Sequence, residues 1–233
     1  MSLKHFFCAV AIAAFVVSQS SAAMMNYGTI SGPNYTFVDV TEDNLETDLF
    51  YDGNLMTSGD TLIVEPEGFR IQVDGPGIDL LDSELQLMIT PNDDSGSVDM
   101  LEFVEEGDFS LVGGGVVGAS LSYFWQIAEV DGVAITPIGG SGQTEFSSTT
   151  TGSGQIWNLG FAVDLASELS AAGSSGRITK VNLRFDNQLT AQAGENEVAF
   201  IAKKQTSGIN ITVPEPSSFS LLLISLLGFV RRK

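Results

Sequence analysis

The segment Val181-Asn182-Leu183-Arg184-Phe185-Asp186 decides the fold class of this chain. Its apolar residues alternate strictly with polar ones. Successive side chains of a β-strand point to opposite faces, so a period of two indicates a strand with one buried face. The segment therefore predicts a half-buried β-strand.

Further segments have a strand pattern. The alternation recurs over residues 69–73, 85–89 and 209–213, and a short apolar run over 61–64 stops before Pro66. Turn-forming clusters separate such segments, at residues 52–54, 58–60, 74–77, 92–96 and 139–142. One helix-like stretch covers 165–172 and stops at Gly173. Short strands at this spacing predict an all-β fold, an antiparallel β-sandwich, with a jelly roll as one form of it.

The composition excludes several kinds of catalytic site. The chain has one histidine and one cysteine, His5 and Cys8, and both lie in the first 23 residues. The rest of the chain therefore offers no Ser-His-Asp or Cys-His catalysis, no His/Cys zinc site and no iron–sulfur cluster. It also has no disulfide, so a single domain must rely on its core. These observations predict a protein that is not an enzyme and needs no cofactor.

The charge is strongly acidic. Asp and Glu number 29 against 10 Lys and Arg, which gives a formal net charge of −19. Between Met24 and Gly176, Arg70 is the sole basic residue. Nucleic acid and anionic lipid are therefore expected to be poor partners. Divalent cations remain compatible with the charge, but solubility in salt is a sufficient explanation of it.

The first 23 residues have the pattern of a secretory signal peptide. Lys4 and His5 are basic, residues 6–17 are apolar, and small residues fill 20–23. We expect a signal helix, cleavage after Ala22 or Ala23, and export through the Sec machinery. A membrane anchor is the alternative, which the short apolar stretch disfavours.

The end of the chain has three parts. Pro214-Glu215-Pro216 comes first, an uncharged apolar segment follows over 217–230, and Arg231-Arg232-Lys233 closes the chain. A helix over those 14 residues would be about 21 Å long, against roughly 30 Å of hydrocarbon. Basic residues favour the cytoplasmic side, so the body would lie on the other side of the membrane. A core helix is the alternative, and it would carry a polar face that this segment lacks.

This order of motif, apolar segment and basic end resembles the PEP-CTERM sorting signal of exported bacterial proteins. The resemblance implies that an exosortase, a membrane-embedded transpeptidase-like enzyme, recognises the tail and removes it near Pro214-Glu215-Pro216. It also implies an envelope-bearing bacterium that makes extracellular polysaccharide. The chain would then consist of a signal peptide (1–23), a β-sandwich domain (24–213) and the sorting signal (214–233) with its C-terminal hydrophobic helix. The protein would pass through the inner membrane transiently and reach the cell surface or the extracellular space.

Part of the body is loosely similar to the β-rich cargo domains that precede such tails. The similar residues are 58–62, Gly68-Phe69, 78–85 and 105–111. Those domains suggest no activity for this chain, so the resemblance implies only the fold and the export route.

Two sets of residues are candidates for binding. Tyr123 and Trp125 would share one face of a strand and Phe124 the other, so one face could stack on sugar rings. Trp157 could also stack on a sugar ring. For all three candidates, Tyr123, Trp125 and Trp157, the alternative is packing in the core. Asp93, Asp94 and Asp99 lie in an oxygen-rich segment that suits calcium but does not fit an EF-hand, and a turn between strands is the alternative.

These patterns favour a non-enzymatic protein of the cell surface or extracellular matrix with a structural or adhesive role. A carbohydrate-binding module, dependent on calcium or not, is the first alternative, and extracellular polysaccharide would be its partner. A carboxylate-dependent glycosidase is a remote alternative, because acidic pairs are so frequent here that they carry no information.

Overall fold

The computed structural model describes residues 23–44, 55–64, 66, 68–203 and 209–213. Most of these residues lie in antiparallel β-strands, arranged in two sheets. Within these residues, no helix has the length and apolar character needed to cross a membrane. Residues 1–22 of the signal segment and the C-terminal tail over 214–233, with their expected helices, lie outside the described residues, and Ala23 is the first residue of the first strand.

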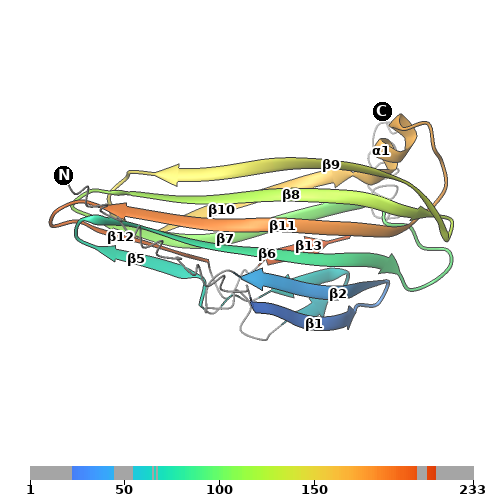
Figure 1. The fold of residues 1–233 in the computed structure, drawn as a ribbon, viewed down its shortest axis with the longest axis horizontal. Helices are drawn as coiled ribbons and strands as arrows, with labels where there is room; N and C mark the ends of the chain where they lie inside the picture. The colour runs from blue at the N-terminus through green and yellow to red at the C-terminus, as the bar shows by residue number, and fades with distance from the viewer. Residues whose placement is uncertain (1–22, 45–54, 65, 67, 204–208, 214–233) are drawn as a thin grey trace, which may run out of the picture.

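The first sheet contains the four longest of the described strands (Figure 1). Its order is β1 (Ala23–Ser31), β2 (Tyr35–Asn44), β6 (Gly77–Pro91), β11 (Ile178–Ala193), β8 (Val116–Val130) and β9 (Val133–Ser148). The decisive segment 181–186 lies in β11, which pairs with β6 on one side and with β8 on the other.

The second sheet is built around β7 (Met100–Val112). One edge of β7 pairs with β10 (Gly152–Asp164) along its length. The other edge is shared by two short strands, β13 (Ile209–Thr212) and β12 (Val198–Lys203). The sheet continues through β4 (Thr61–Val64) and β3 (Leu55–Ser58) beside β13, and through β5 (Arg70–Asp74) beside β12.

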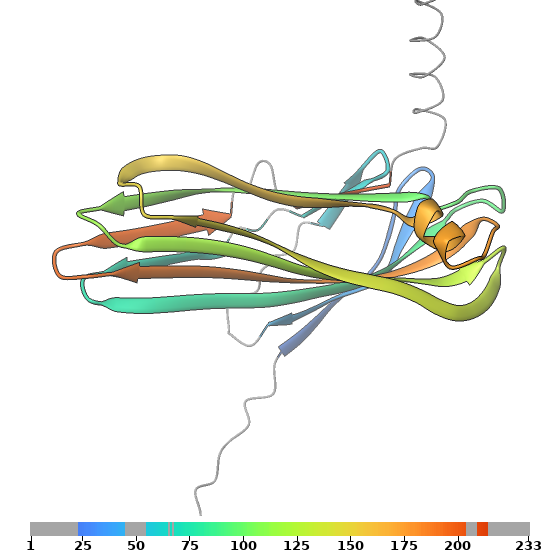
Figure 2. The same ribbon diagram turned by 90° about the horizontal axis from the view of Figure 1, so that it is seen from above.

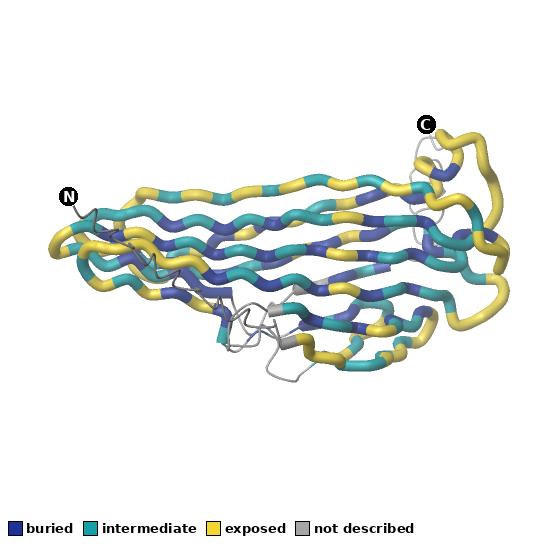
Figure 3. The backbone as a smooth tube through the Cα atoms, in the orientation of Figure 1, coloured by how far each residue is buried: buried dark blue, intermediate teal, exposed yellow. Residues whose placement is uncertain are grey.

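The two sheets pack face to face and enclose the core, as the view along the layers shows (Figure 2). Burial alternates along the strands (Figure 3). In β11, Val181, Leu183 and Phe185 are buried, whereas Arg184 is exposed. Rings from both sheets meet in the core: Phe185 of β11 lies 4.8 Å from Phe103 of β7, centroid to centroid. The all-β, antiparallel fold predicted from period two is confirmed.

The predicted helix is also confirmed, as α1 (Leu165–Ala171). The Asp164 side chain caps its first turn by accepting a hydrogen bond from the Ser167 amide at 2.9 Å. Leu165 and Leu169 are buried, and Gly173 follows with a φ of 76°. That left-handed conformation costs glycine little, so the helix ends there.

Two details of the sequence-based prediction are wrong. The strands are not uniformly short, because β6 and β8 have 15 residues each and β9 and β11 have 16 each. Residues 139–142 form no turn but lie inside β9. Two of its glycines are needed there for space: a Cβ on Gly140 would collide with the ring of Trp125, and one on Gly142 with the ring of Tyr123.

Candidate functional site

The outer face of the first sheet is the strongest candidate for a binding surface. In β8 the odd-numbered residues from Val117 to Ile127 point into the core, and the even-numbered ones point outward. The outward residues are small or polar except Phe124, whose exposed fraction is 36%. The strand register therefore places hydrogen-bonding side chains in rows across the face.

Each row crosses four strands in the order β6, β11, β8 and β9. The five rows are Leu80–Thr190–Gly118–Ser147, Asp82–Gln188–Ser120–Glu145, Glu84–Asp186–Ser122–Gln143, Gln86–Arg184–Phe124–Ser141 and Met88–Asn182–Gln126–Gly139.

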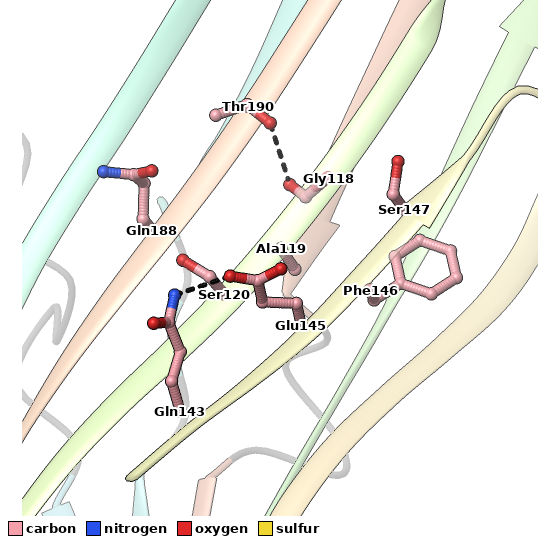
Figure 4. Close-up of a pocket in the computed structure, with 9 residues that line it drawn as sticks. All are labelled: Gly118, Ala119, Ser120, Gln143, Glu145, Phe146, Ser147, Gln188 and Thr190. Carbon is pink, nitrogen blue, oxygen red and sulfur yellow. Dashed lines mark hydrogen bonds between the residues drawn. The ribbon is translucent and has the colours of Figure 1, made fainter. Parts of the chain in front are cut away.

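Three adjoining hollows run along these rows, and we call them together the polar trough. Their volumes are about 260, 550 and 450 Å³. The first and second share Gln143, and the second and third share Phe124 and Arg184. Figure 4 shows the first hollow, with Gln188, Ser120 and Glu145 from three neighbouring strands around it.

Hydrogen bonds between neighbouring side chains fix the orientation of several groups in the trough. Gln143 Nε2 donates to Glu145 Oε1 at 2.7 Å. Asn182 Nδ2 donates to Gln126 Oε1 at 3.1 Å across β11 and β8. Such contacts hold donors and acceptors in place before a ligand arrives, which lowers the entropy cost of binding.

The exposed ring of Phe124 has a cationic neighbour. The guanidinium carbon of Arg184 lies 6.0 Å from the ring centroid, within the range of a cation–π contact. Arg184 Nε also lies 3.6 Å from Glu84 Oε2. The Phe124–Arg184 pair thus places an apolar ring beside a positive charge where the second and third hollows meet.

Carboxylates dominate the charge of the trough. Glu84 and Asp186 are direct register partners on β6 and β11. Like charges in such positions repel each other. Asp186 Oδ1 is buried and accepts no hydrogen bond within the described structure.

A second polar group of residues lies inside the sandwich, between the two sheets. Lys203 of β12 donates to Glu105 of β7 and to Asn187 Oδ1 of β11, the latter at 2.5 Å. The side chains of Lys203 and Glu105 are each 1% exposed. Burial raises the pKa of Glu105 and lowers the pKa of Lys203, because both charged forms lose their hydration.

The aromatic candidates lie on the core side of their strands. Trp125 and Trp157 are 5% and 2% exposed, so neither offers a free ring face to a sugar in this structure. Tyr123 is half-buried and stacks on Phe161. The outward aromatic residue of β8 is Phe124, which the sequence placed on the opposite face but did not single out. The polar residues at the alternate positions 120, 122 and 126 would have identified it.

The calcium candidates Asp93, Asp94 and Asp99 all lie in the loop between β6 and β7. Asp93 Oδ1 accepts hydrogen bonds from the amide and the hydroxyl of Ser95, both at 2.7 Å. Asp99 Oδ1 accepts one from Ser97 Oγ at 2.5 Å. Among the described residues, no three His, Cys, Asp or Glu side chains gather closely enough to hold a metal ion.

The sorting motif Pro214-Glu215-Pro216 and the basic end Arg231-Arg232-Lys233 lie outside the described residues. Sequence reasoning missed Lys203, Glu105 and Asn187 as a group. A lysine that directly follows the apolar run 198–202 was the one available signal.

No protein-family model matches the sequence, and no curated protein is significantly similar to it. Among solved structures, TmCBM61 in complex with β-1,4-galactotriose matches with 10% identity and a TM-score of 0.28, covering 66% of this chain and 83% of that one. The structure of infectious bursal disease virus strain Gt matches with 14% identity and a TM-score of 0.25, covering 78% and 50%. The family 11 xylanase from Neocallimastix patriciarum matches with 6% identity and a TM-score of 0.23, covering 82% and 100%. Likenesses of this degree say nothing about the site or its ligand.

Proposed function

We propose that this is an exported, non-enzymatic adhesive protein whose sandwich binds a neutral polysaccharide along the polar trough. The observation that carries the proposal is the trough itself: polar side chains from neighbouring strands lie side by side across it, several of them held by hydrogen bonds, with the exposed ring of Phe124 among them. Sugars combine hydroxyl groups, which donate and accept, with apolar ring faces. The trough offers partners for both.

The shape of the trough suits a chain rather than a single sugar. From Thr190 to Asn182 it extends over eight steps of β11, which is roughly 26 Å at the rise of a β-strand. Deep, mostly apolar pockets suit compact ligands. A shallow and polar surface of this length suits an extended, hydrated polymer.

The charge of the trough selects among polysaccharides. Glu84, Asp186 and Glu145 line it, and its cation, Arg184, lies beside Glu84. The whole chain has a formal net charge of −19. A polymer of uronic acids would therefore be repelled, and a neutral polymer would not.

We further propose that the sandwich is a jelly roll. Strands β5 to β12 would be its eight strands, in sheets ordered β5-β12-β7-β10 and β6-β11-β8-β9. In that order the chain passes from one sheet to the other at every connection except β8 to β9. This alternation supports the two Greek keys of a jelly roll.

The export half of the proposal rests on the two ends of the sequence. The signal pattern over 1–23 and the PEP-CTERM-like tail over 214–233 agree on a destination outside the inner membrane. Sec machinery and an exosortase would handle the chain on the way. Adhesion to extracellular polysaccharide would be its role on arrival.

Affinity electrophoresis in gels that contain one polysaccharide each tests the proposal. We expect retardation by at least one neutral polymer and none by uronate polymers. Gln188→Ala removes an amide from the trough and should weaken retardation about fivefold, the equivalent of one lost hydrogen bond of about 1 kcal/mol. The matched control is Gln72→Ala, an exposed amide on β5 of the other sheet, which should change nothing. Equal effects of the two variants would contradict the proposed surface.

A further inference from the structure

The buried group of Lys203, Glu105 and Asn187 has the composition of a reactive centre. A primary amine, a carboxylic acid and a side-chain amide meet in the core, although they come from three strands and both sheets. Asn187 is 1% exposed, and both partners of the Lys203–Glu105 pair are 1% exposed at the side chain. Stability alone is a weak reason to keep such a pair, because burying two charges costs about as much as their attraction returns.

Aromatic rings line this centre. Lys203 Nζ lies 5.5 Å from the centroid of Phe69 and 5.8 Å from that of Trp157, and both rings are buried. The Trp157 ring lies against Gly107, where a Cβ would collide with it, and its Nε1 donates to Ala202 O at 3.2 Å. The rings hold the amine in place and keep bulk water from it.

The geometry points to an intramolecular isopeptide bond between Lys203 Nζ and Asn187 Cγ. The chain would form this bond by itself, with Glu105 as the acid–base that moves the protons. The bond would join β12 of one sheet to β11 of the other through the core.

The amine is suited to act as a nucleophile. An amine attacks only in its neutral form, and burial favours the neutral form by lowering the pKa of Lys203 and raising that of Glu105. The hydrogen bond between Lys203 and Glu105 gives the proton a direct path from the ammonium to the carboxylate. Burial therefore favours a neutral amine beside a neutral carboxylic acid over the charged pair.

The amide is suited to be the electrophile. Lys203 Nζ lies 2.5 Å from Asn187 Oδ1, so the amine is next to the carbonyl that it would attack. Asn187 Nδ2, the nitrogen that would leave, is buried and makes no hydrogen bond. Glu105 Oε1 is likewise buried without a hydrogen bond. No hydrogen bond of Nδ2 has to be broken when it leaves.

The reaction balances without any oxidant or further reactant. The neutral amine of Lys203 attacks Asn187 Cγ, and a C–N bond forms while the carbonyl oxygen gains charge. Glu105 protonates that oxygen or the departing nitrogen and takes the proton that the attacking amine loses. The bond from Cγ to Nδ2 breaks, one molecule of ammonia leaves, and Glu105 is regenerated.

Peptide mapping of the full chain tests the bond directly. No lysine or arginine lies between Arg184 and Lys203, so trypsin places Asn187 and Lys203 in one peptide. An isopeptide bond blocks cleavage after Lys203. We expect a peptide over residues 185–204 that lacks the mass of one ammonia and gives no fragments between positions 187 and 203. Lys180, which pairs with the partly exposed Glu129, should be cleaved normally in the same digest and is the internal control.

Two results would overturn the proposal. A peptide that ends at Lys203 with its full mass would show an ordinary ion pair. A peptide that lacks ammonia but still ends at Lys203 would show a succinimide at Asn187 instead of a cross-link. The wild-type digest alone decides between these outcomes, whether or not any variant folds.

Glu105→Gln tests the assigned acid–base, because it keeps the size of the side chain and removes its proton transfer. We expect its digest to contain the full-mass peptide that ends at Lys203, with less than a tenth of the cross-linked form. Cross-linking at the wild-type extent in this variant would refute the role of Glu105.

Discussion

The rings of Tyr123 and Phe161 stack across the core, with centroids 3.8 Å apart and an interplanar angle of 13°. Tyr123 belongs to β8 of the first sheet and Phe161 to β10 of the second. Phe103 continues the stack, with its centroid 5.2 Å from that of Phe161. The contact joins the two layers, and it gives Tyr123 a structural role.

Tyr123→Ala should therefore reduce stability without removing an outward-facing side chain of the trough. Removing this half-buried aromatic ring leaves a cavity, and we expect the free energy of unfolding to fall by about 2 kcal/mol. Chemical denaturation followed by tryptophan fluorescence measures the change. The folded fraction should keep its polysaccharide retardation, and a selective loss of retardation at unchanged stability would contradict this role.

Gly142→Ala should destabilise the same contact from the opposite strand. A Cβ at Gly142 would collide with the ring of Tyr123, so the ring must move away from Phe161. We expect a loss of about 1–3 kcal/mol, the usual effect of overpacking. Ser141→Ala is the matched control, because its side chain lies on the outer face and should change stability by less than about 0.5 kcal/mol. Equal melting temperatures for the two variants would refute the packing argument.

The sequence predicted the structural features that depend on a local pattern of residues. Period two over 181–186 identified a strand, and Gly173 marked the end of the helix. The cluster 139–142 misled the prediction, because glycine is frequent both in turns and where a ring needs space inside a sheet. The sequence alone does not reveal that Tyr123 and Trp125 occupy that space.

The buried group of Lys203, Glu105 and Asn187 could not be predicted from the sequence for a different reason. Lys203 and Glu105 are 98 positions apart, and only the order of strands around β7 brings them together. The aromatic segment 123–125 offered a choice of face, because all three of its residues are apolar. Ser122 and Gln126, the polar residues on either side of it, lie on the same face of the strand as Phe124 and show that this face is the outer one.

Asp93 should titrate below the usual range of an aspartate. The Ser95 hydroxyl and then the Ser95 amide donate to its carboxylate and lower its pKa. Because a lowered pKa favours the folded loop only while the carboxylate is ionised, this support is present above the pKa of the unfolded chain and is lost as the pH falls through the folded value. Ser95→Ala should move the pKa upward in an NMR titration, and an unchanged titration would rule out the Ser95 contact.

Chelation should leave polysaccharide retention unchanged, because the proposed contacts are direct hydrogen bonds between side chains of the trough and sugar hydroxyls and involve no metal ion. Affinity electrophoresis with and without a chelator measures this. Retention that disappears with the chelator and returns with calcium would instead support the calcium-dependent form of the binding module.

Deleting residues 214–233 should change where the protein is found. If the tail is a sorting signal, the truncated chain should leave the surface fraction and lose its processing step. Cell fractionation with immunoblotting measures both, and Gln72→Ala with its tail intact serves as the control. Unchanged location and unchanged processing would refute the sorting signal.

The most direct test of the proposed trough is calorimetric titration of Phe124→Ala with the neutral polysaccharide that retards the wild-type chain. Phe124 is exposed, so this variant should unfold within about 0.5 kcal/mol of the wild type. Losing the aromatic contact should weaken binding by about 1 kcal/mol, which is about fivefold. Wild-type affinity in Phe124→Ala, at unchanged stability, would contradict the claim that the outer face of the first sheet binds the polymer.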